Sequence, residues 1–427
     1  MQKTKLKQTE IGEIPEDWES STIADALNIN PKRELKKGTN AKAVAMQDIK
    51  EFNKKIQNFT PKPFKGGSKF KNGDTLMARI TPCLENGKTA FVDILDEDET
   101  GFGSTEFIVL SGKDGKTTND FVYYLAISPQ MRADAIQSMT GTSGRQRVQN
   151  DLLGSKEITI PTLSEQKIIA KILSDLDAKI ELNQQMNKTL ETIGQSLFKH
   201  WFIDFEFPSD KGKPYKNSGG EMIDSELGEI PNGWKVSNIG KEMKTVLGGT
   251  PSRERKEYWA NGNIPWINSG EINKFPITEA SEYITPDALK SSATQLMPSR
   301  TVVIPFVISI NKEINISVLG IETCGNQSVL GIIENKQIPS EFIYYWIKFM
   351  KENIYSWATG GAQQHINKTN VDKTEILIPK KEIMQNYFKS LNPLFNLIIK
   401  NALESKNLSQ IRDSLLPKLM SGKIRIR

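Results

Sequence analysis

The chain has 427 residues, of which 37% are hydrophobic and 25% charged, proportions typical of a globular protein with two or three domains. Lysine and arginine exceed aspartate and glutamate by 56 − 51 = 5, a balance that permits a polyanionic partner without requiring one. Cys83 and Cys324 have no CxxC partner, which argues against disulfides and zinc sites and favours a reducing cytoplasm. The most apolar run, Thr301 to Ile310, contains Pro305 and is too short to span a bilayer, so no membrane association is expected.

The first half of the chain has the pattern of one α/β domain. A Gly-Glu-Ile-Pro-x-x-Trp segment at Gly12–Trp18 precedes a polar stretch, 28–69, that is punctuated by glycine and proline. The segment Asp120–Met131, with its Phe-Val-Tyr-Tyr run, favours a helix. Short apolar runs bounded by turn residues indicate strands at Asp74–Ile80, Thr89–Leu95 and Phe107–Leu110.

The segment Ser164–Phe202 predicts a long helix, because its apolar residues fall on a heptad grid. Lys179 and Asn183 interrupt this grid with polar side chains. A helix of this kind cannot bury its apolar seam alone, so a second helix is expected to pack against it. One grid position holds Ile169, Leu176, Leu190 and Leu197, and the other holds Ile172, Met186 and Ile193.

The second half repeats these landmarks in the same order. Gly228–Trp234 matches the first segment at an offset of 228 − 12 = 216, and the run at Phe342–Tyr345 matches at 342 − 121 = 221. Strands are expected at Val302–Ile310 and Val329–Ile333, and a helix at Glu341–Asn353. The period is far longer than the about 20 to 50 residues of solenoid repeats. We therefore predict a duplicated α/β domain with pseudo-two-fold symmetry and two similar surfaces, for which duplex DNA is the foremost partner.

The heptad grid also returns in the second half. The two long helices should pack as an antiparallel coiled coil, which would bring Asn183 and Asn401 close together and let them set the register of the pair. The alternative is that each asparagine faces solvent. Pro393 predicts a kink or a late start of the second helix. The repeated grid positions, 218 residues on, are Tyr387, Leu394, Asn401, Leu408 and Leu415.

These patterns divide the chain into two domains, two helical spacer regions and a linker. Each domain is followed directly by its helical region, and the linker connects the first helix to the second domain. The expected bounds are 1–161 for the first domain, 162–205 for the first helical region, 206–227 for the linker, 228–379 for the second domain and 380–427 for the second helical region.

Motifs for catalysis are missing from the sequence. There is no GxxxxGK[ST] loop and no GxGxxG after a strand, and His200 and His365 do not have the spacing of metal ligands. Asn392–Phe395 resembles a base-gripping loop of amino-methyltransferases, but it lacks the second proline and lies on the heptad grid. We expect no catalytic residue, metal or cofactor in this chain.

Polar and basic loops remain as candidates for nucleic-acid contacts. Glycines let the backbone approach phosphates closely, while arginine and glutamine suit guanine and adenine edges. For each candidate a solvated loop or a salt bridge is an equal alternative, but related loops stand at matching places in both halves. The candidates are Arg79, Ser143, Gly144, Arg145, Gln146, Arg147, Thr250, Ser252, Arg253, Arg255, Lys256, Gln363 and Gln364.

The order of these landmarks resembles the specificity (S) subunit of type I restriction-modification systems, over essentially the whole chain. The motifs that carry the resemblance are Leu76–Lys88, Ser104–Phe107, Lys179–Asn183, Leu197–Phe205, Gly248–Pro251, Tyr258-Trp259 and Ile264–Ile267. The resemblance implies two target recognition domains, each reading one half of a bipartite site in double-stranded DNA, with the two helices as a ruler between them. It also implies two methyltransferase (M) subunits and ATP-driven restriction (R) subunits, so that S-adenosylmethionine, ATP and Mg are expected in the partner subunits.

Two other functions are less consistent with the sequence. A self-sufficient modification enzyme would need a cofactor-binding loop and a base-gripping motif, and both are absent. A coiled-coil structural scaffold would explain the helices but not two glycine-rich basic domains. The sequence therefore predicts a non-catalytic, sequence-specific DNA-binding subunit, with the scaffold as the alternative.

Overall fold

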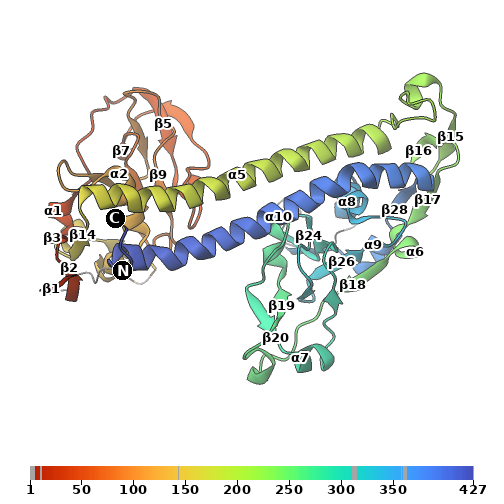
Figure 1. The fold of residues 1–427 in the computed structure, drawn as a ribbon. Helices are drawn as coiled ribbons and strands as arrows, with labels where there is room; N and C mark the ends of the chain where they lie inside the picture. The colour runs from red at the N-terminus through yellow and green to blue at the C-terminus, as the bar shows by residue number, and fades with distance from the viewer. Residues whose placement is uncertain are drawn as a thin grey trace. The chain divides into compact units, whose positions relative to one another are not determined.

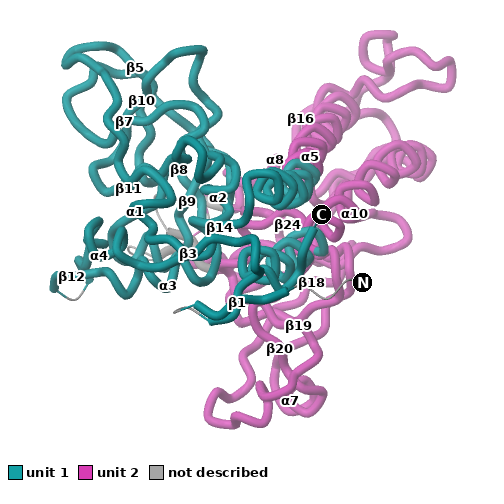
Figure 2. Tube along the Cα trace, turned by 60° about the vertical axis from the view of Figure 1, so that its left-hand side comes forward, with its two compact units in different colours: residues 1–180, 407–427 teal, residues 181–406 magenta. Residues whose placement is uncertain are grey.

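The computed structural model describes residues 5–9, 12–142, 144–309, 315–356, 358 and 363–426. The chain forms two compact units (Figures 1 and 2): unit 1 comprises residues 1–180 and 407–427, and unit 2 comprises residues 181–406. Two long helices, α5 (Leu163–Phe202) and α10 (Lys381–Met420), each contribute one part to unit 1 and the other part to unit 2.

Unit 1 is built on two four-stranded sheets. Its strands are β1 (Leu6–Thr9), β2 (Gly12–Pro15), β3 (Glu19–Thr22), β4 (Leu27–Ile29), β5 (Asn40–Val44), β6 (Thr60–Pro63), β7 (Ser68–Phe70), β8 (Thr75–Ala78), β9 (Thr89–Phe91), β10 (Gly101–Gly103), β11 (Phe107–Gly112), β12 (Met139–Thr140), β13 (Arg147–Val148) and β14 (Glu157–Ile160). Its short helices are α1 (Ile23–Ala26), η1 (Met46–Asp48), α2 (Asn119–Ile127), α3 (Pro129–Gln137) and α4 (Asn150–Gly154).

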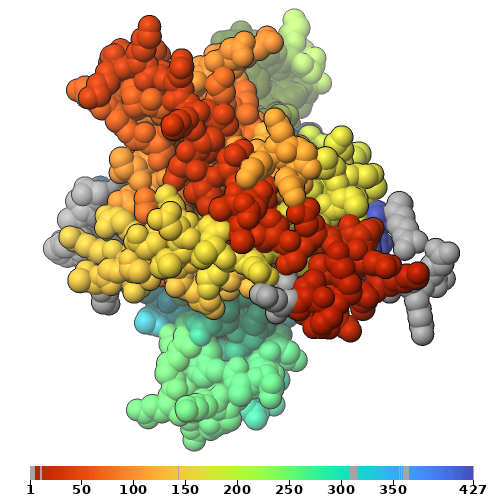
Figure 3. Space-filling view, turned by 90° about the vertical axis from the view of Figure 1, so that its left-hand side faces the viewer, coloured from red at the N-terminus to blue at the C-terminus, as the bar shows by residue number. Residues whose placement is uncertain are grey.

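The sheets of unit 1 have a simple order. One is antiparallel, β4-β11-β8-β9, and the other is β6-β5-β10-β7, in which only β5 and β10 run parallel. Strands β3 and β14 pair antiparallel and so bring the start and the end of the domain together. In Figure 3 the red N-terminal residues accordingly lie against the yellow residues around β14.

Unit 2 repeats this topology. Its sheets have the orders β18-β26-β22-β24 and β20-β19-β25-β21, the middle pair of the second is again parallel, and β17 pairs with β28 as β3 does with β14. The strands are β15 (Met222–Ser225), β16 (Gly228–Pro231), β17 (Lys235–Asn238), β18 (Lys244–Leu247), β19 (Ile264–Ile267), β20 (Glu282–Ile284), β21 (Leu296–Met297), β22 (Val302–Pro305), β23 (Val307–Ser309), β24 (Ser317–Val318), β25 (Thr323–Gly325), β26 (Val329–Ile333), β27 (Gln363–His365) and β28 (Glu375–Ile378). The helices are α6 (Ile239–Glu242), α7 (Pro286–Lys290), α8 (Ser340–Ser356), α9 (Lys368–Lys373) and the single turns η2 (Lys216–Ser218), η3 (Lys256–Tyr258) and η4 (Ser269–Asn273). The predicted duplication of an α/β domain is confirmed.

The repeated tryptophan contacts α5 in each unit, and in unit 2 the ring centroid of Trp234 lies 5.8 Å from that of Phe202. In unit 1 the indole N–H of Trp18 donates to Glu165 of α5 at 2.8 Å. Arg425, near the end of the chain, contacts both Glu165 and Asp17 at 2.7 Å. The core of unit 1 also contains Leu416, Leu419 and Met420 of α10. Unit 1 is thus completed by the C-terminal residues.

The repeated Tyr-Tyr run attaches each domain to a long helix. The hydroxyl of Tyr124 donates to Asp177 of α5 at 2.7 Å, and Asp177 also accepts from Arg412 of α10 at 2.8 Å. Burial, followed by the charge of Asp177, raises the pKa of Tyr124, which therefore stays a donor. In unit 2 the hydroxyl of Tyr344 donates to Glu191 of α5 at 2.6 Å. The run is a structural anchor in both copies.

The long helices differ from the prediction at two places. The helix α10 begins at Lys381, so the late start predicted from Pro393 is wrong. Ile193, assigned to the buried grid, is 48% exposed. The neighbouring Gly194 is buried under Tyr345 of α8, whose hydroxyl oxygen would stand 2.2 Å from a Cβ at this position. The heptad pattern fails at this point because α5 packs against α8 as well as α10.

Three shorter segments also differ. The helix predicted at Asp120–Met131 is two helices, because Ser128 is extended, with φ −64° and ψ 148°, and Pro129 opens α3. The stretch 28–69, expected to be irregular, contains β5, β6 and most of β7. The segment 206–227, expected to be a linker, contains β15, which pairs with β16. The helices α5 and α10 lie within the segments 162–205 and 380–427, and each contributes to both units.

Candidate nucleic-acid interface

The glycine-rich loop of unit 1 joins β12 to β13. Gly141 and Gly144 have φ of +121° and +78°, a region that L side chains rarely adopt. The N–H of Arg145 donates to the carbonyl of Thr142 at 3.0 Å. The Arg145 side chain is exposed and makes no hydrogen bond or ion pair with another described residue. Its guanidinium is available to a ligand.

The loop lies directly beside Arg79. The guanidinium of Arg79 donates to the carbonyl of Val148 at 2.7 Å, and the N–H of Val148 donates to the carbonyl of Arg79 at 2.9 Å. Two residues further on, the N–H of Thr81 donates to the carbonyl of Gln146 at 3.1 Å. The structure therefore brings two candidate segments, far apart in sequence, into one surface.

Arg147 is engaged with a carboxylate. Its guanidinium donates to both oxygens of Glu106 at 2.8 to 3.0 Å, and this hydrogen bonding, together with the charge of Glu106, raises the pKa of Arg147. For Arg147 the geometry matches the salt-bridge alternative. A DNA base edge could accept hydrogen bonds from both Nε and Nη2 of Arg147 only after displacing Glu106.

In unit 2 the segment 250–256 covers aromatic rings. The guanidinium of Arg253 lies 3.6 Å from the ring centroid of Trp259. It donates two hydrogen bonds to the carboxylate of Glu282, the longer of which measures 2.8 Å. The hydrogen bond to Glu282 raises the pKa of Arg253 and lowers that of Glu282. Arg255 donates to the hydroxyl of Tyr258. Both arginines are held by neighbours in this structure.

The remaining candidates of unit 2 differ in their partners and in whether their side chains are described. The hydroxyl of Thr250 donates to Gln327, and the carbonyl of Ser252 accepts from Trp259 at 3.1 Å. Lys256 is exposed and has no side-chain partner within the described part of the chain. Gln363 and Gln364 lie on β27, which pairs antiparallel with β23, and only their main chain is described. In unit 1, Gly144 is exposed, whereas Ser143 lies outside the described residues.

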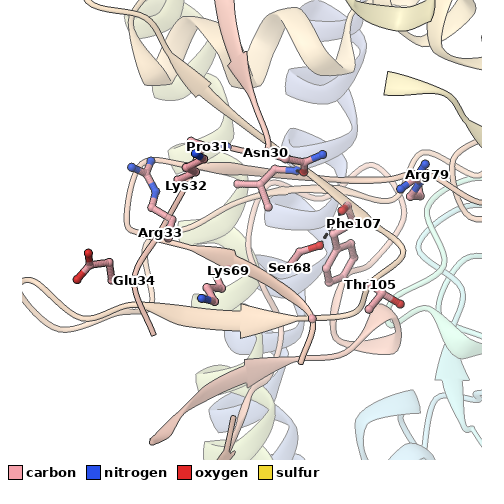
Figure 4. A pocket seen from close by; sticks show the side chains of 12 residues that line it. Asn30, Pro31, Lys32, Arg33, Glu34, Ser68, Lys69, Arg79, Thr105 and Phe107 are labelled. Atoms are coloured by element: carbon pink, nitrogen blue, oxygen red, sulfur yellow. Dashed lines mark hydrogen bonds between the residues drawn. The ribbon is translucent and has the colours of Figure 1, made fainter. Parts of the chain in front are cut away.

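A cavity of about 650 Å³ lies in unit 1 beside the first candidates (Figure 4). Only Arg79 among its residues was predicted from the sequence. The Nε atom of Arg79 is buried and has no hydrogen-bond partner in the described structure. The cavity is lined by Asn30, Pro31, Lys32, Arg33, Glu34, Gly67, Ser68, Lys69, Arg79, Thr105, Phe107 and Val109.

Lys32 and Lys69 are not among the candidates predicted from the sequence, where the stretch 28–69 stands out only as polar and punctuated by glycine and proline. A usable signal was present. Pro31-Lys32-Arg33-Glu34 returns as Pro251-Ser252-Arg253-Glu254, at an offset of 251 − 31 = 220. The first segment follows β4 and the second follows β18, which are equivalent edge strands. The candidate segment of unit 2 therefore has a counterpart in unit 1.

The two grid asparagines meet inside the helix pair. Asn183 is completely buried and Asn401 is 4% exposed, so neither faces solvent. The amide of Asn183 donates to Glu404 at 2.9 Å and to the carbonyl of Asn401 at 3.4 Å. Asn401 donates to Asn187 at 3.0 Å. Asn183 contacts Glu404, whereas Asn187, which is later in α5, contacts Asn401, which is earlier in α10. The predicted antiparallel packing is therefore confirmed.

Two features are absent from the described residues. Within 5–9, 12–142, 144–309, 315–356, 358 and 363–426, no group of three His, Cys, Asp or Glu side chains could hold a metal ion. Every helix in those ranges is too short or too polar to cross a lipid bilayer.

Fold and site together define a class of protein: a duplicated α/β binding module, with basic loops at matching places, whose copies are joined by a shared antiparallel helix pair. The chain belongs to the type I restriction modification DNA specificity domain family, whose model matches residues 15–192 and 231–411. It is a specificity subunit of type I restriction-modification systems, as its landmarks predicted, and it carries two target recognition domains.

Individual relatives agree over the full length. The chain is 29% identical over 440 residues to the type I restriction enzyme MjaIX specificity subunit of Methanocaldococcus jannaschii, covering 99% of this chain and 97% of that protein. It is 25% identical over 467 residues to the HindI specificity subunit of Haemophilus influenzae, covering 96% and 100%. The crystal structure of an S subunit from M. genitalium matches with a TM-score of 0.55 and 17% identity over 98% of both chains, a likeness of fold.

Proposed function

We propose that this chain is the non-catalytic DNA-recognition subunit of its complex and reads a bipartite duplex site, one half with each unit. The observation that carries this proposal is the repeated topology. Each unit has the same two sheets, and each places a basic Pro-x-Arg-Glu loop after the equivalent edge strand. Two similar surfaces in one chain suit two segments of one duplex, and their different side chains would give two different half-site sequences.

A second part of the proposal is that the chain recruits two methyltransferase subunits through its helices. Ile193 on α5 and Ile411 on α10 occupy the same position of the repeat, 411 − 193 = 218 residues apart, and are 48% and 47% exposed. Each stands between two partly buried leucines, Leu190 and Leu197 in one case and Leu408 and Leu415 in the other. Exposed apolar stripes on helices suit partner helices. Two equivalent stripes support two copies of one partner.

The chemistry would then belong to the partners. S-adenosylmethionine would bind the methyltransferase subunits, and ATP and Mg the restriction subunits. The alternative, a scaffold without sequence-specific binding, does not explain why Arg145 on a loop of unit 1 and Lys256 at the start of η3 in unit 2 are left exposed. We therefore favour recognition over the scaffold.

The decisive experiment is methylation-sensitive sequencing of DNA from cells that express this chain with its methyltransferase subunit. We expect one modified motif with two specified halves and an unspecified spacer. Duplexes carrying that motif, and a scrambled control, should then be titrated with the purified complex. Equal binding of motif and control, or methyl transfer by the pure chain alone, would contradict the proposal.

A further inference from the structure

We infer that the cavity of unit 1 binds the sugar-phosphate backbone of the duplex, through Lys32 and Lys69, and that Arg33 acts only as a positioning residue. This inference rests on the proposed function, because it identifies which part of the DNA occupies the cavity. The two lysines come from different segments, Lys32 from the loop after β4 and Lys69 from β7, and both line the same cavity (Figure 4).

Arg33 is already satisfied by a buried carboxylate. Its guanidinium contacts Asp74 at 2.7 Å through Nη2 and 3.3 Å through Nε. Asp74 is 1% exposed and also accepts the main-chain N–H of Lys71 at 2.8 Å. A carboxylate this deeply buried needs its cation, since an unpaired buried charge is costly. The pair therefore fixes the loop, and Arg33 has little left to offer a ligand.

Lys32 and Lys69 are not neutralised in this way. Lys32 is exposed and has no hydrogen bond or ion pair with another residue that the structure describes. The ammonium group of Lys69 lies 5.2 Å from the ring centroid of Phe64 and forms no ion pair with any described carboxylate. Glu34 is the one acidic residue among those that line the cavity. The net positive charge of the lining residues therefore favours an anionic ligand.

The neutral lining residues complete a backbone site. Asn30, Ser68 and Thr105 contribute short polar side chains, while the floor is formed by Phe107 and Val109, each 1% exposed. Rings and branched chains so deeply buried offer no face on which a base could stack. Ammonium groups bind phosphate as point charges and do not read base edges by paired donors. The occupant is therefore a phosphate with its sugar.

Unit 2 provides an internal comparison. Its loop keeps the proline, the arginine and the glutamate, and Arg253 is again held by a carboxylate, that of Glu282. The residue equivalent to Lys32 is Ser252, which carries no charge. Both loops thus hold their arginine through a carboxylate, whereas the lysine at position 32 is replaced by serine in unit 2.

The test uses the full chain in complex with its methyltransferase subunits, and two duplexes, one with the modified motif and one scrambled. Affinity is measured over a range of salt concentrations for the wild type, Lys32→Ala, Lys69→Ala and the control Lys156→Ala. The control also removes one positive charge from unit 1, but it does not line the cavity. Each phosphate contact contributes about 0.9 to the slope of log affinity against log salt.

We expect each cavity variant to lower this slope by about one and to weaken both duplexes by the same factor. The control should keep the wild-type slope. Arg33→Ala should lower thermal stability, which Lys32→Ala and Lys69→Ala should leave unchanged.

Three results would overturn the inference: cavity variants that behave like Lys156→Ala, a loss confined to the motif duplex, or an Arg33→Ala protein of normal stability with a lower slope. If the wild-type complex binds both duplexes equally, the proposed function fails instead. The slopes then still decide whether the cavity holds a phosphate.

Discussion

Asn183 donates its side-chain amide to the main-chain carbonyl of Asn401, the residue that occupies the same place in the second copy, 401 − 183 = 218 residues later. Within unit 2 only one register of the antiparallel helices brings these equivalent residues together. A slip by one heptad would separate them and leave buried amides without partners. This relationship gives the first prediction.

Replacing Asn183 by alanine should lower the free energy of unfolding by about 1 to 3 kcal/mol, because Glu404 and Asn401 lose a buried partner. Replacing both asparagines by leucine should also be destabilising, since Glu404 and Asn187 then lose their amide partners. Urea unfolding measures both effects, and Gln195→Ala, on the exposed face of α5, is the matched control. A single variant as stable as the control would show that the amide pair does not define the register.

Replacing Arg145 by alanine should relax recognition of one half-site only. A bidentate arginine–guanine contact is worth about 1 to 3 kcal/mol of discrimination, and Arg145 is the exposed arginine of its loop. Sequencing of the modified motif should show one degenerate position in one half and an unchanged other half. Arg147→Ala is the comparison, because that guanidinium is paired with Glu106. Equal weakening on all duplexes would make Arg145 a phosphate contact.

The two cysteines should differ in reactivity. Burial raises the pKa of the Cys324 thiol to about 11, and its side chain is completely buried, whereas Cys83 is partly exposed. Because the thiolate is the reactive form, iodoacetamide at pH 8 should modify Cys83 and leave Cys324 intact. Modification of Cys324 should increase as the pH approaches its raised pKa. Peptide mass spectrometry reads both sites, and in denaturant they should react alike; equal rates in the native protein would contradict the burial of Cys324.

The ruler hypothesis can be tested by lengthening both helices together. Glu191 holds α8 through Tyr344, so the insertion is placed elsewhere: one heptad after Ile180 in α5 and one after Lys406 in α10. Each insertion adds about 10 Å at about 1.5 Å per residue, or roughly three base pairs at about 3.4 Å. The variant should prefer a correspondingly longer spacer with both half-sites unchanged. An insertion in one helix alone is the control, and an unchanged spacer in the double variant would show that the helices do not set it.

Periodic features of this fold could be predicted from the sequence. The Tyr-Tyr run and the Gly-Glu-Ile-Pro-x-x-Trp segment were recognised because they recur, and both prove to be anchors in each unit, as at Tyr124 and Trp18. The heptad pattern located both long helices. It failed at Ile193, because a third helix, α8, contacts α5 there and the period then no longer describes the buried face.

The candidate site was harder to predict, because the partners of its arginines lie far away in the sequence. Glu106 is 147 − 106 = 41 residues from Arg147, and Glu282 is 282 − 253 = 29 residues from Arg253. No local pattern distinguishes a paired arginine from one available to DNA. The repeated Pro-x-Arg-Glu pattern could have drawn attention to Lys32, but its proximity to Lys69 could not be predicted, since only the folded chain brings the loop after β4 and strand β7 to one cavity.

The composition of unit 1 has a consequence for how the protein is made. Its core needs Leu416 and Leu419, and its N-terminal Asp17 is paired with Arg425, 408 residues later. Unit 2, residues 181–406, is continuous in sequence. During synthesis from the N-terminus, unit 1 must therefore wait for residues 416–425 before its core is complete, while unit 2 can close around its own core earlier. A nascent chain that stalls before residue 416 would hold a folded second half and an open first half.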